Sequence, residues 1–422
     1  MLIKQYNADR VEIIEKKTSP FMNVSVSDEG LVIEQQYFGP GTPIYYTKHK
    51  DTLLLCDSLQ TLKTYAGLRY ELNTDMLPHF FYNGFIYGTH TLIKGVGKLP
   101  LCKRIIVRKN GVIFEKWDNE EDSLYHFTNQ DAMETLYDQY LRDVLGELGL
   151  REIPVTLALS GGFDSNCLLH YMKTLYPEKE LLTVCVGGIS GIDERTIARS
   201  IAMSYEGVRF VESIVTSETL EHLDHIVQCL EGCVYERGIF LQYELAKKLQ
   251  QESASNILCG ECADQVFHDG SYRKHSDRFL YDYRNTPREM AAYVVLPKSY
   301  LMLRAFGIQG CYPFLDPRIV SIGKATAQVN GAEKRFHKIF CEHQLPRAVF
   351  SKLEKVGGST SLTALWQSYS TTALEKAIMD SKYYDPSFRI TEKYSYDEAL
   401  MDYWLSLKYI DSFERQFCDG GT

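Results

Sequence analysis

The most informative residues of the chain are two serines, two glycines and an aspartate within one short run, Ser160-Gly161-Gly162-Phe163-Asp164-Ser165. Such a run is suited to phosphate, because glycines let the backbone approach closely and a helix N-terminus favours negative charge. Ser160 and Ser165 add hydroxyl donors, and Asp164 can hold a magnesium ion that bridges phosphates. The run lacks the Gly-Lys-Thr or Gly-Lys-Ser ending of a Walker-type loop. A serine-capped turn without a ligand is the alternative interpretation.

The segments around this run predict an α/β fold. Val155–Leu159 has the pattern of a short buried strand and is followed by a helical stretch. Leu181–Val186 is a second such strand, with a helix from about Asp193, and Asn256–Cys259 is a third. Strands that alternate with helices favour a parallel sheet covered on both faces. From about Ser276 onward the pattern is mostly helical.

The first part of the chain, to about Asn119, is predicted to be β-rich. Short apolar or alternating runs stand at 31–33, 44–46, 53–55 and 104–108, and Lys109-Asn110-Gly111 is a hairpin signal. The acidic stretch 118–122 marks a boundary between two predicted domains, 1–122 and 123–422. Beyond it, Asp131–Leu148 carries apolar residues at helical spacing, with Thr128 as the predicted cap.

Composition narrows the class of protein. The 422 residues are 45% hydrophobic and 24% charged, which is ordinary for a globular protein with two domains. We expect a cytoplasmic protein, because no apolar run is long enough to span a membrane, the N-terminus lacks signal-peptide features and the eleven cysteines form no disulfide pattern. The net charge of −9 argues against a nucleic-acid partner.

Four segments in the same order resemble the asparagine synthetase and β-lactam synthetase family. The 160–165 run resembles the family's pyrophosphatase loop, and Gly260-Glu261-Cys262-Ala263-Asp264 resembles its Gly-Glu-Gly-Ala-Asp segment. Pro313-Phe314-Leu315-Asp316 and the stretch from Leu345-Pro346 to Gly357 resemble two later segments. The resemblance implies an adenine-nucleotide α-hydrolase-like synthetase domain that cleaves ATP between the α and β phosphates, giving an adenylate and pyrophosphate.

The resemblance also implies roles for individual residues. Asp264 would be the second magnesium-binding carboxylate, opposite Asp164, although a solvated or helix-capping acid is the alternative. Glu261 would manage proton transfer when a nitrogen nucleophile attacks, since an amine attacks only when neutral; β-lactam synthetases have a tyrosine there. The remaining predicted contacts to the nucleotide are Leu159, Val186, Cys259 and Gly260, beside the 160–165 loop.

Lys355 is the residue predicted to neutralise charge on the α-phosphate and the acyl oxygen. Lys352 is the alternative, and Glu354 interrupts the Arg-x-Lys spacing of the family. A surface lysine in a glycine-containing loop is the simpler interpretation of Lys355.

The N-terminal part resembles the later portion of the family's glutaminase domain. Pro43–Tyr46, Leu54–Ser58, Phe81–Phe85 and Ile93–Pro100 carry that resemblance. Family amidotransferases use an N-terminal cysteine, whereas here Met1 precedes Leu2 and the first cysteine is Cys56. The resemblance therefore implies a truncated glutaminase-like domain without its catalytic nucleophile.

Together these features predict an ATP- and Mg²⁺-dependent ligase that adenylates a small-molecule or peptide carboxylate and forms an amide, lactam or peptide-like bond without glutamine hydrolysis, in a specialised biosynthetic pathway. The nitrogen would come from an amine on a substrate, from free ammonia or from a separate donor protein. Plain asparagine synthesis from aspartate and ammonia also stays open.

Two alternatives change the chemistry more. Cys259 or Cys262 could serve a sulfur-transfer variant of the reaction, whereas half of a zinc site is less favoured because no second Cys/His pair has suitable spacing. A non-catalytic binding protein on the same fold is the other alternative, although retention of Asp164, Glu261 and Asp264 together argues against it.

Overall fold

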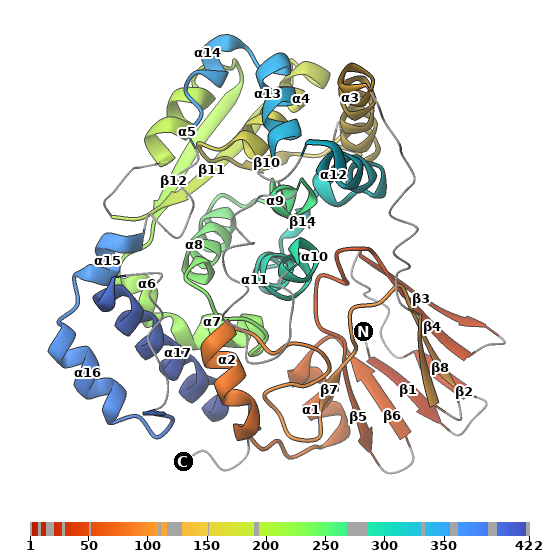
Figure 1. Cartoon of the computed structure of the whole chain (residues 1–422), viewed down its shortest axis with the longest axis vertical. Helices are drawn as coiled ribbons and strands as arrows, with labels where there is room; N and C mark the ends of the chain where they lie inside the picture. Colours follow the sequence, from red (N-terminus) through yellow and green to blue (C-terminus); the bar gives the residue numbers. More distant parts are fainter. Residues whose placement is uncertain are drawn as a thin grey trace.

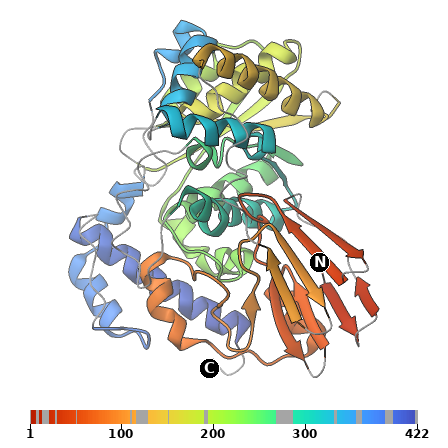
Figure 2. The same cartoon turned by 45° about the vertical axis from the view of Figure 1, so that its right-hand side comes forward.

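The structure is a computed structural model of the chain. It describes residues 2–6, 10–13, 21–27, 30–49, 52–108, 111–115, 129–150, 152–189, 194–267, 286–330, 334–354, 362–386 and 395–418. Two antiparallel sheets lie in the N-terminal part, and one parallel sheet lies at the far end of the molecule among helices (Figures 1 and 2). This arrangement confirms the predicted α/β class with a β-rich N-terminal part.

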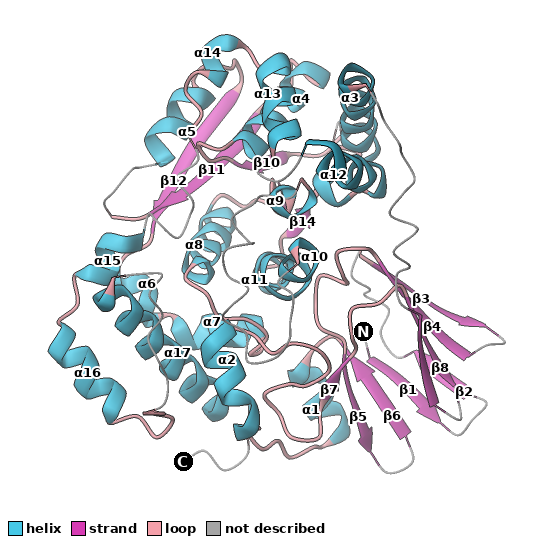
Figure 3. Ribbon diagram, in the orientation of Figure 1, coloured by secondary structure: helices cyan, strands magenta, loops and turns pink. Residues whose placement is uncertain are grey.

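The parallel sheet positions the candidate site. Its strand order is β12-β11-β10-β13-β14, and all its pairs are parallel. Helices α4 (Phe163–Leu175) and α5 (Glu194–Ala202) follow β10 and β11, and α8 (Gly238–Gln251) packs against β11 and β12 from the other side (Figure 3). The strands are β10 (Val155–Ala158), β11 (Leu181–Gly187), β12 (Val208–Ile214), β13 (Asn256–Leu258) and β14 (Gln309–Cys311).

Three of these strands, β10, β11 and β13, match the sequence prediction, whereas β12 and β14 were missed. β12 lies at an edge of the sheet, and most of its residues are only partly buried. Charged residues such as Arg209 and Glu212 therefore interrupt its apolar pattern. β14 has three residues, including a glycine, which is too short for a periodic signal.

The N-terminal sheets pack face to face. One has the order β2-β1-β6-β5-β7 and the other β3-β4-β8-β9. Apolar side chains from both, including Ile33, Leu55 and Ile105, form a core between them. The strands are β1 (Leu2–Tyr6), β2 (Arg10–Ile13), β3 (Met22–Ser27), β4 (Gly30–Gln35), β5 (Tyr45–His49), β6 (Thr52–Cys56), β7 (Gly97–Lys98), β8 (Arg104–Arg108) and β9 (Gly111–Glu115).

The predicted hairpin and the predicted helix are both present. β8 and β9 pair antiparallel with Arg108 opposite Gly111, while Lys109 and Asn110 lie outside the described residues. The helix α3 spans Gln130–Glu147, close to the predicted 131–148. Its cap is Asn129, whose side chain accepts from the backbone N–H of Asp131 at 2.9 Å. The prediction of Thr128 was wrong by one residue, because an asparagine in the extended region caps a helix as well as a threonine.

Helices surround the parallel sheet and join it to the N-terminal sheets. The C-terminal helix α17 packs against α7 and reaches back to α2 (Figure 1). No helix in the described ranges has the length and apolarity that crossing a membrane requires. The longer helices are α1 (Leu59–Ala66), α2 (Leu77–Asn83), α4 (Phe163–Leu175), α5 (Glu194–Ala202), α7 (Leu223–Leu230), α8 (Gly238–Gln251), α11 (Leu296–Ala305), α12 (Pro317–Asn330), α13 (Arg335–Gln344), α16 (Thr371–Met379) and α17 (Tyr396–Phe417).

The remaining elements are short. They are α6 (Ser217–Glu221), α9 (Ala263–Val266), α10 (Pro287–Met290), α14 (Arg347–Phe350), α15 (Thr363–Gln367), the 3-10 turns at Thr74–Met76 and Pro313–Leu315, and a π-helical stretch at Ala291–Val295. The π-helical stretch continues into α11, the helix that carries Lys298.

Candidate active site

The phosphate-loop residues lie between the end of β10 and the start of α4. Ser165 Oγ accepts from the Ser160 N–H at 3.0 Å, and Ser160 Oγ accepts from the Gly162 N–H at 3.1 Å. Asn166 Nδ2 donates to the carbonyls of Ser160 and Gly162 at 2.8 and 2.7 Å. The loop is therefore held in shape by its own side chains. Asn166, which the sequence analysis did not single out, is fully buried and completes this network.

The N-terminus of α4 is open toward the cavity. Gly162 occupies the N-cap position and makes no side-chain cap hydrogen bond, and α4 runs for thirteen residues. The first N–H groups of a helix have no partner within the helix, and its N-terminus carries partial positive charge. This end of α4 therefore suits an anion such as a phosphate.

A second loop approaches the first from the end of β13. A Cβ atom on Gly260 would lie 3.1 Å from both Asp164 Cβ and the Ser165 nitrogen. A glycine lets the two loops come this close without displacing these atoms. Cys262 then takes a left-handed backbone conformation (φ 69°) before α9 begins, which brings Asp264 into the first turn of that helix.

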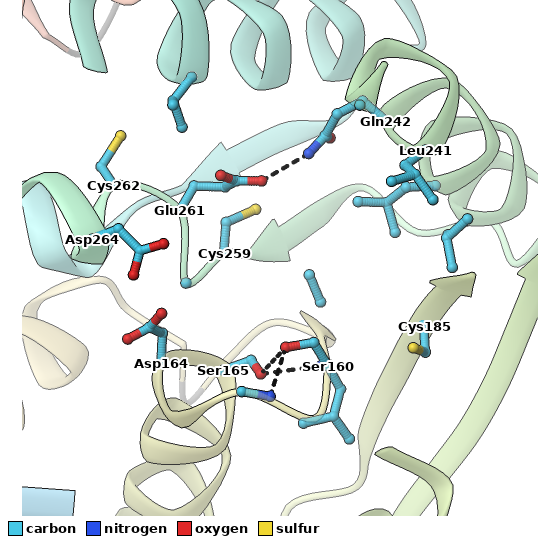
Figure 4. A pocket seen from close by; sticks show the side chains of 18 of the residues that line it. Ser160, Asp164, Ser165, Cys185, Leu241, Gln242, Cys259, Glu261, Cys262 and Asp264 are labelled. Atoms are coloured by element: carbon cyan, nitrogen blue, oxygen red, sulfur yellow. Dashed lines mark hydrogen bonds between the residues drawn. The ribbon is translucent and has the colours of Figure 1, made fainter. Parts of the chain in front are cut away.

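Asp164 and Asp264 face one another across the space between the two loops (Figure 4). They follow β10 and β13, which are adjacent in the sheet. The predicted placement of two acids at the carboxyl ends of neighbouring parallel strands is therefore confirmed as geometry. Their assignment as metal ligands stays a prediction.

The structure adds two cationic side chains that the sequence analysis missed. Lys334 Nζ contacts Asp164 Oδ1 and lies 2.6 Å from Asp264 Oδ1, and its side chain is only 2% exposed. His337 Nε2 lies 3.1 Å from Asp164 Oδ1, and its ring stacks on Phe267. Burial alone would raise the pKa of Asp164, but Lys334 and His337 hold that pKa well below its usual range.

His337 is itself held in place. Tyr137 Oη lies 3.0 Å from its Nδ1 atom. Burial opposes the charged ring, but Cys341 and Asp164 beside it raise the pKa of His337 to about 9. The raised pKa favours the protonated ring, whose Nε2 forms an ion pair with Asp164. A lysine and a histidine within a helical segment give no motif, so the sequence offered no signal for either.

Asp164 and Asp264 border a cavity of about 440 Å³, within the usual range for ligand sites. Val184, Val186, Leu241 and Leu245 give it an apolar side. The predicted residues that line it are Leu159, Ser160, Gly162, Asp164, Ser165, Val186, Cys259, Gly260, Glu261 and Asp264.

Two of the described residues that the sequence predicts, Gly161 and Lys352, do not line this cavity. Gly161 packs against the backbone instead: the Glu354 N–H donates to its carbonyl at 3.0 Å. Lys355 lies outside the described residues. Lys352, its alternative, donates to Ser200 O and Ser204 Oγ at 2.9 and 3.0 Å, beside the end of α5. Lys352 therefore has a structural partner away from the phosphate loop.

The far end of the cavity is polar. Gln242 Nε2 donates to Glu261 Oε1 at 2.8 Å, and Gln242 Oε1 is buried with no hydrogen-bond partner among the described residues (Figure 4). Burial raises the pKa of Glu261, and Lys298 opposes this rise. Lys298 Nζ in turn pairs with Glu236 Oε1 at 2.6 Å. Gln242, Glu236 and Lys298 belong to helical or loop segments without a recognisable motif, so the sequence analysis missed them.

The cysteines near the cavity are poor nucleophiles. Cys259 and Cys262 are buried and unpaired with other cysteines, and burial raises the pKa of both thiols well above its usual value. Only the thiolate attacks or transfers sulfur efficiently. The structure therefore disfavours a sulfur-transfer role for these two residues.

The fold and the loop define a class, an α/β domain with a parallel sheet and a loop of serines and glycines at a strand end. Residues 138–298 match the asparagine synthase family model. This part of the chain is thus similar to asparagine synthases, which supports the family resemblance for these residues. The truncated glutaminase-like domain stays a prediction.

Two curated relatives are similar to parts of the chain. The chain is 24% identical over 294 residues to glutamine-hydrolysing asparagine synthetase 1 of Bacillus subtilis strain 168, covering 65% of this chain and 43% of the relative. It is 28% identical over 133 residues to argininosuccinate synthase of Roseiflexus sp. strain RS-1, covering 30% and 31%. The chain therefore spans less than half the length of either relative.

Among solved structures, the U34-tRNA thiolase NcsA of Methanococcus maripaludis is similar at 13% identity. The match covers 57% of this chain and 83% of that one, with a TM-score of 0.30. A superposition of this quality has no bearing on function.

Proposed function

We propose that the chain is an ATP-dependent ligase that adenylates a carboxylate and transfers the acyl group to a nitrogen nucleophile. The observation that carries this proposal is the facing pair Asp164 and Asp264, above the open N-terminus of α4 and within the segment that matches the asparagine synthase family model. A cavity beside this pair has an apolar side and a polar end, as a nucleotide and a polar substrate require.

The triphosphate would lie at the loop and the N-terminus of α4. The base would lie against Val184, Val186 and Leu241. Asp164 and Asp264 would hold Mg²⁺, and they suit it because both are hard oxygen donors that one cation reaches together, as the ammonium of Lys334 does. When bound, Mg²⁺ would neutralise charge on the phosphates.

The reaction balances in two steps. A carboxylate oxygen of the substrate attacks the α-phosphorus, the bond between the α and β phosphates breaks, and pyrophosphate leaves. The nitrogen nucleophile then attacks the acyl carbon, and AMP leaves. Lys355 is proposed to offset the charge that develops in both steps. The backbone of Glu354, its neighbour in sequence, hydrogen-bonds to the phosphate loop.

Glu261 is proposed as the base that takes the proton of the attacking nitrogen. Burial raises its pKa, which makes its carboxylate a stronger base than an exposed glutamate. Gln242 orients it through the 2.8 Å hydrogen bond, and the free Oε1 atom of Gln242 can accept an N–H from the nucleophile. The paired charges of Glu236 and Lys298 favour a polar acyl substrate.

Product analysis tests the proposal. The purified protein is incubated with ATP, Mg²⁺ and a panel of carboxylates and amines, and nucleotides are separated by chromatography. We expect AMP and pyrophosphate, with exchange of labelled pyrophosphate into ATP when the carboxylate is present without the amine. ADP and phosphate as the main products with a turned-over substrate would exclude this mechanism.

We further propose that residues 1–122 and 123–422 are separate functional units, and that the nitrogen does not come from glutamine hydrolysed within this chain. Free ammonia, an amine on a substrate or a separate donor protein would supply it. Comparing ammonium chloride, amines and glutamine as nitrogen sources in the same assay tests this point. Glutamate release from glutamine by the purified chain would contradict it.

A further inference from the structure

The space between Asp164 and Asp264 already contains a cation. Lys334 Nζ contacts Asp164 Oδ1 and lies 2.6 Å from Asp264 Oδ1, so one ammonium bridges both acids. A divalent cation held by the same two oxygens would need this position. Within the described ranges, no cluster of three or more His, Cys, Asp and Glu side chains could hold a metal ion.

Lys334 is built into this position rather than lying there by chance. Its side chain is 2% exposed, which is rare for a lysine unless it is paired. Its backbone takes the left-handed conformation at φ 59°, which costs energy for a residue with a side chain. It directly precedes α13, whose first turn carries His337, the second partner of Asp164. The two ion pairs thus anchor the start of α13 to both loops of the site.

We propose that Lys334 is an internal counter-ion that keeps divalent metal out of the Asp164–Asp264 pair until a nucleotide enters. Without phosphates, the two carboxylates carry two negative charges, and the ammonium of Lys334 and the ring of His337 already pair with them. Adding a divalent ion would place two cations within a few ångströms of each other with too little negative charge between them. A triphosphate brings the missing negative charge, so that the metal can take the position between the acids while the ammonium of Lys334 moves to the phosphate oxygens.

The proposal predicts that metal and nucleotide enter together. In the nucleotide-free protein, Asp164 and Asp264 would bind a divalent metal poorly, although their carboxylate oxygens are suitable metal ligands. The prediction for metal binding without nucleotide depends only on the described side chains. The prediction for metal binding with nucleotide rests on the proposed function.

Binding of Mn²⁺, which favours the same oxygen ligands as Mg²⁺, tests the proposal without any turnover. Free Mn²⁺ is measured by electron paramagnetic resonance while the full-length protein is titrated. The wild type should bind no stoichiometric Mn²⁺ in the absence of nucleotide. Lys334→Met should gain one site, at least about tenfold tighter than any wild-type binding. The double variant Lys334→Met/Asp264→Asn should lose that site again.

Lys338→Met is the matched control, because Lys338 lies in the first turn of α13, which Lys334 precedes, and its side chain is exposed. It should behave as wild type. One Mn²⁺ bound by the nucleotide-free wild type, and lost in Asp264→Asn, would overturn the proposal even if Lys334→Met failed to fold. A Lys334→Met protein that folds but binds Mn²⁺ within about threefold of wild type would also overturn it.

A nucleotide arm separates this inference from the proposed function. With the non-hydrolysable analogue α,β-methylene-ATP, the wild type should bind Mn²⁺ and analogue together. Failure of this arm, with the metal-alone results as predicted, would reject the nucleotide site but keep Lys334 as the cation that excludes metal. If the wild type binds Mn²⁺ and the analogue together but also binds Mn²⁺ tightly without nucleotide, the proposed role of Lys334 is rejected and the proposed function is kept.

Discussion

Asp164 and Asp264 are the two proposed metal ligands. Asp164 follows strand β10, and Asp264 follows strand β13. Asp164→Asn and Asp264→Asn should each reduce pyrophosphate exchange by about 100-fold or more, because the lost charge leaves the metal and phosphates misaligned. Both variants should remain folded, since Lys334 keeps one charged partner in each. Circular dichroism and the exchange assay measure the two effects together.

The matched control for these two variants is Asp143→Asn. Asp143 is an exposed acid on α3, away from the residues that line the cavity. The same chemical change there should leave exchange unaltered and alter the free energy of unfolding by no more than about 0.5 kcal/mol. Full activity of Asp264→Asn would mean that Asp264 holds no metal.

A substitution of Glu261 should affect the two half-reactions differently. If Glu261 acts only on the nitrogen nucleophile, Glu261→Gln should keep pyrophosphate exchange within about threefold of wild type and reduce product formation by about 100-fold or more. The glutamine keeps the size of the side chain and can still accept from Gln242. Equal losses in exchange and in product formation would instead place Glu261 in the adenylation step.

Lys355 and Lys352 are the two candidates for the cation that neutralises charge on the α-phosphate. Lys355→Ala should keep ATP affinity but slow turnover by about 100-fold, because a fixed cation matters most in the transition state. Lys352→Ala should keep turnover, since its ammonium is held by Ser200 and Ser204. Nucleotide titration and steady-state rates distinguish the two, and the reverse pattern would transfer the role to Lys352.

At the scale of single residues, predictability depended on motifs. The loop residues and Asp264 stand in short runs in which glycines indicate a close approach of the backbone and acids indicate a cation site. The structure brings these residues together. Lys334, His337 and Gln242 come from segments with ordinary helical composition, so nothing local marks them. Their importance arises only when the fold places them against Asp164 and Glu261.

At the scale of elements, the approach of the two loops depends on Gly260. Gly260→Ala should reduce nucleotide affinity by about tenfold or more, because its Cβ would press on Asp164 Cβ and the Ser165 nitrogen at 3.1 Å. Gly146→Ala is the control: Gly146 lies in α3 with open space around it, and alanine there should stabilise the protein by about 0.5–1 kcal/mol. Calorimetric titration and thermal unfolding measure these effects. Unchanged affinity in Gly260→Ala would show that the loops can separate without loss.

The same scale shows why some elements were predicted and others were not. β10, β11 and β13 are largely buried, so their apolar runs stand out. β12 is half exposed at the sheet edge, and β14 exists because its three residues pair with β13. The pairing partner, rather than the local sequence, determines such strands.

At the scale of the whole molecule, side chains on the two sides of the boundary predicted near residue 122 are in contact. The ring of Phe80 in α2 packs on Tyr409 of α17, and Lys63 Nζ donates to the carbonyl of Phe417 at 2.7 Å. Arg304 also pairs with Asp57 at 3.0 Å. These contacts join residues hundreds of positions apart, which no local pattern predicts.

A substitution of Glu231 tests the contact between α1 and α7, which joins the two parts of the chain. Glu231 ends α7 in a left-handed conformation, is 9% exposed, and accepts from Ser58 Oγ and the Leu59 N–H, both at 2.6 Å, at the start of α1. Glu231→Ala leaves these donors unpaired and should lower the free energy of unfolding by about 1–3 kcal/mol. Glu231→Gln, which keeps one acceptor oxygen, should lose less.

Urea unfolding measures both Glu231 variants, with Glu221→Ala on α6 as an exposed control that should change stability by no more than about 0.5 kcal/mol. Because Glu231 does not line the cavity, nucleotide affinity should be unchanged in the folded variants. An alanine variant as stable as wild type would mean that the α1–α7 contact contributes nothing to holding the N-terminal sheets on the synthetase-like part. A variant that loses nucleotide binding while folded would instead couple this contact to the site.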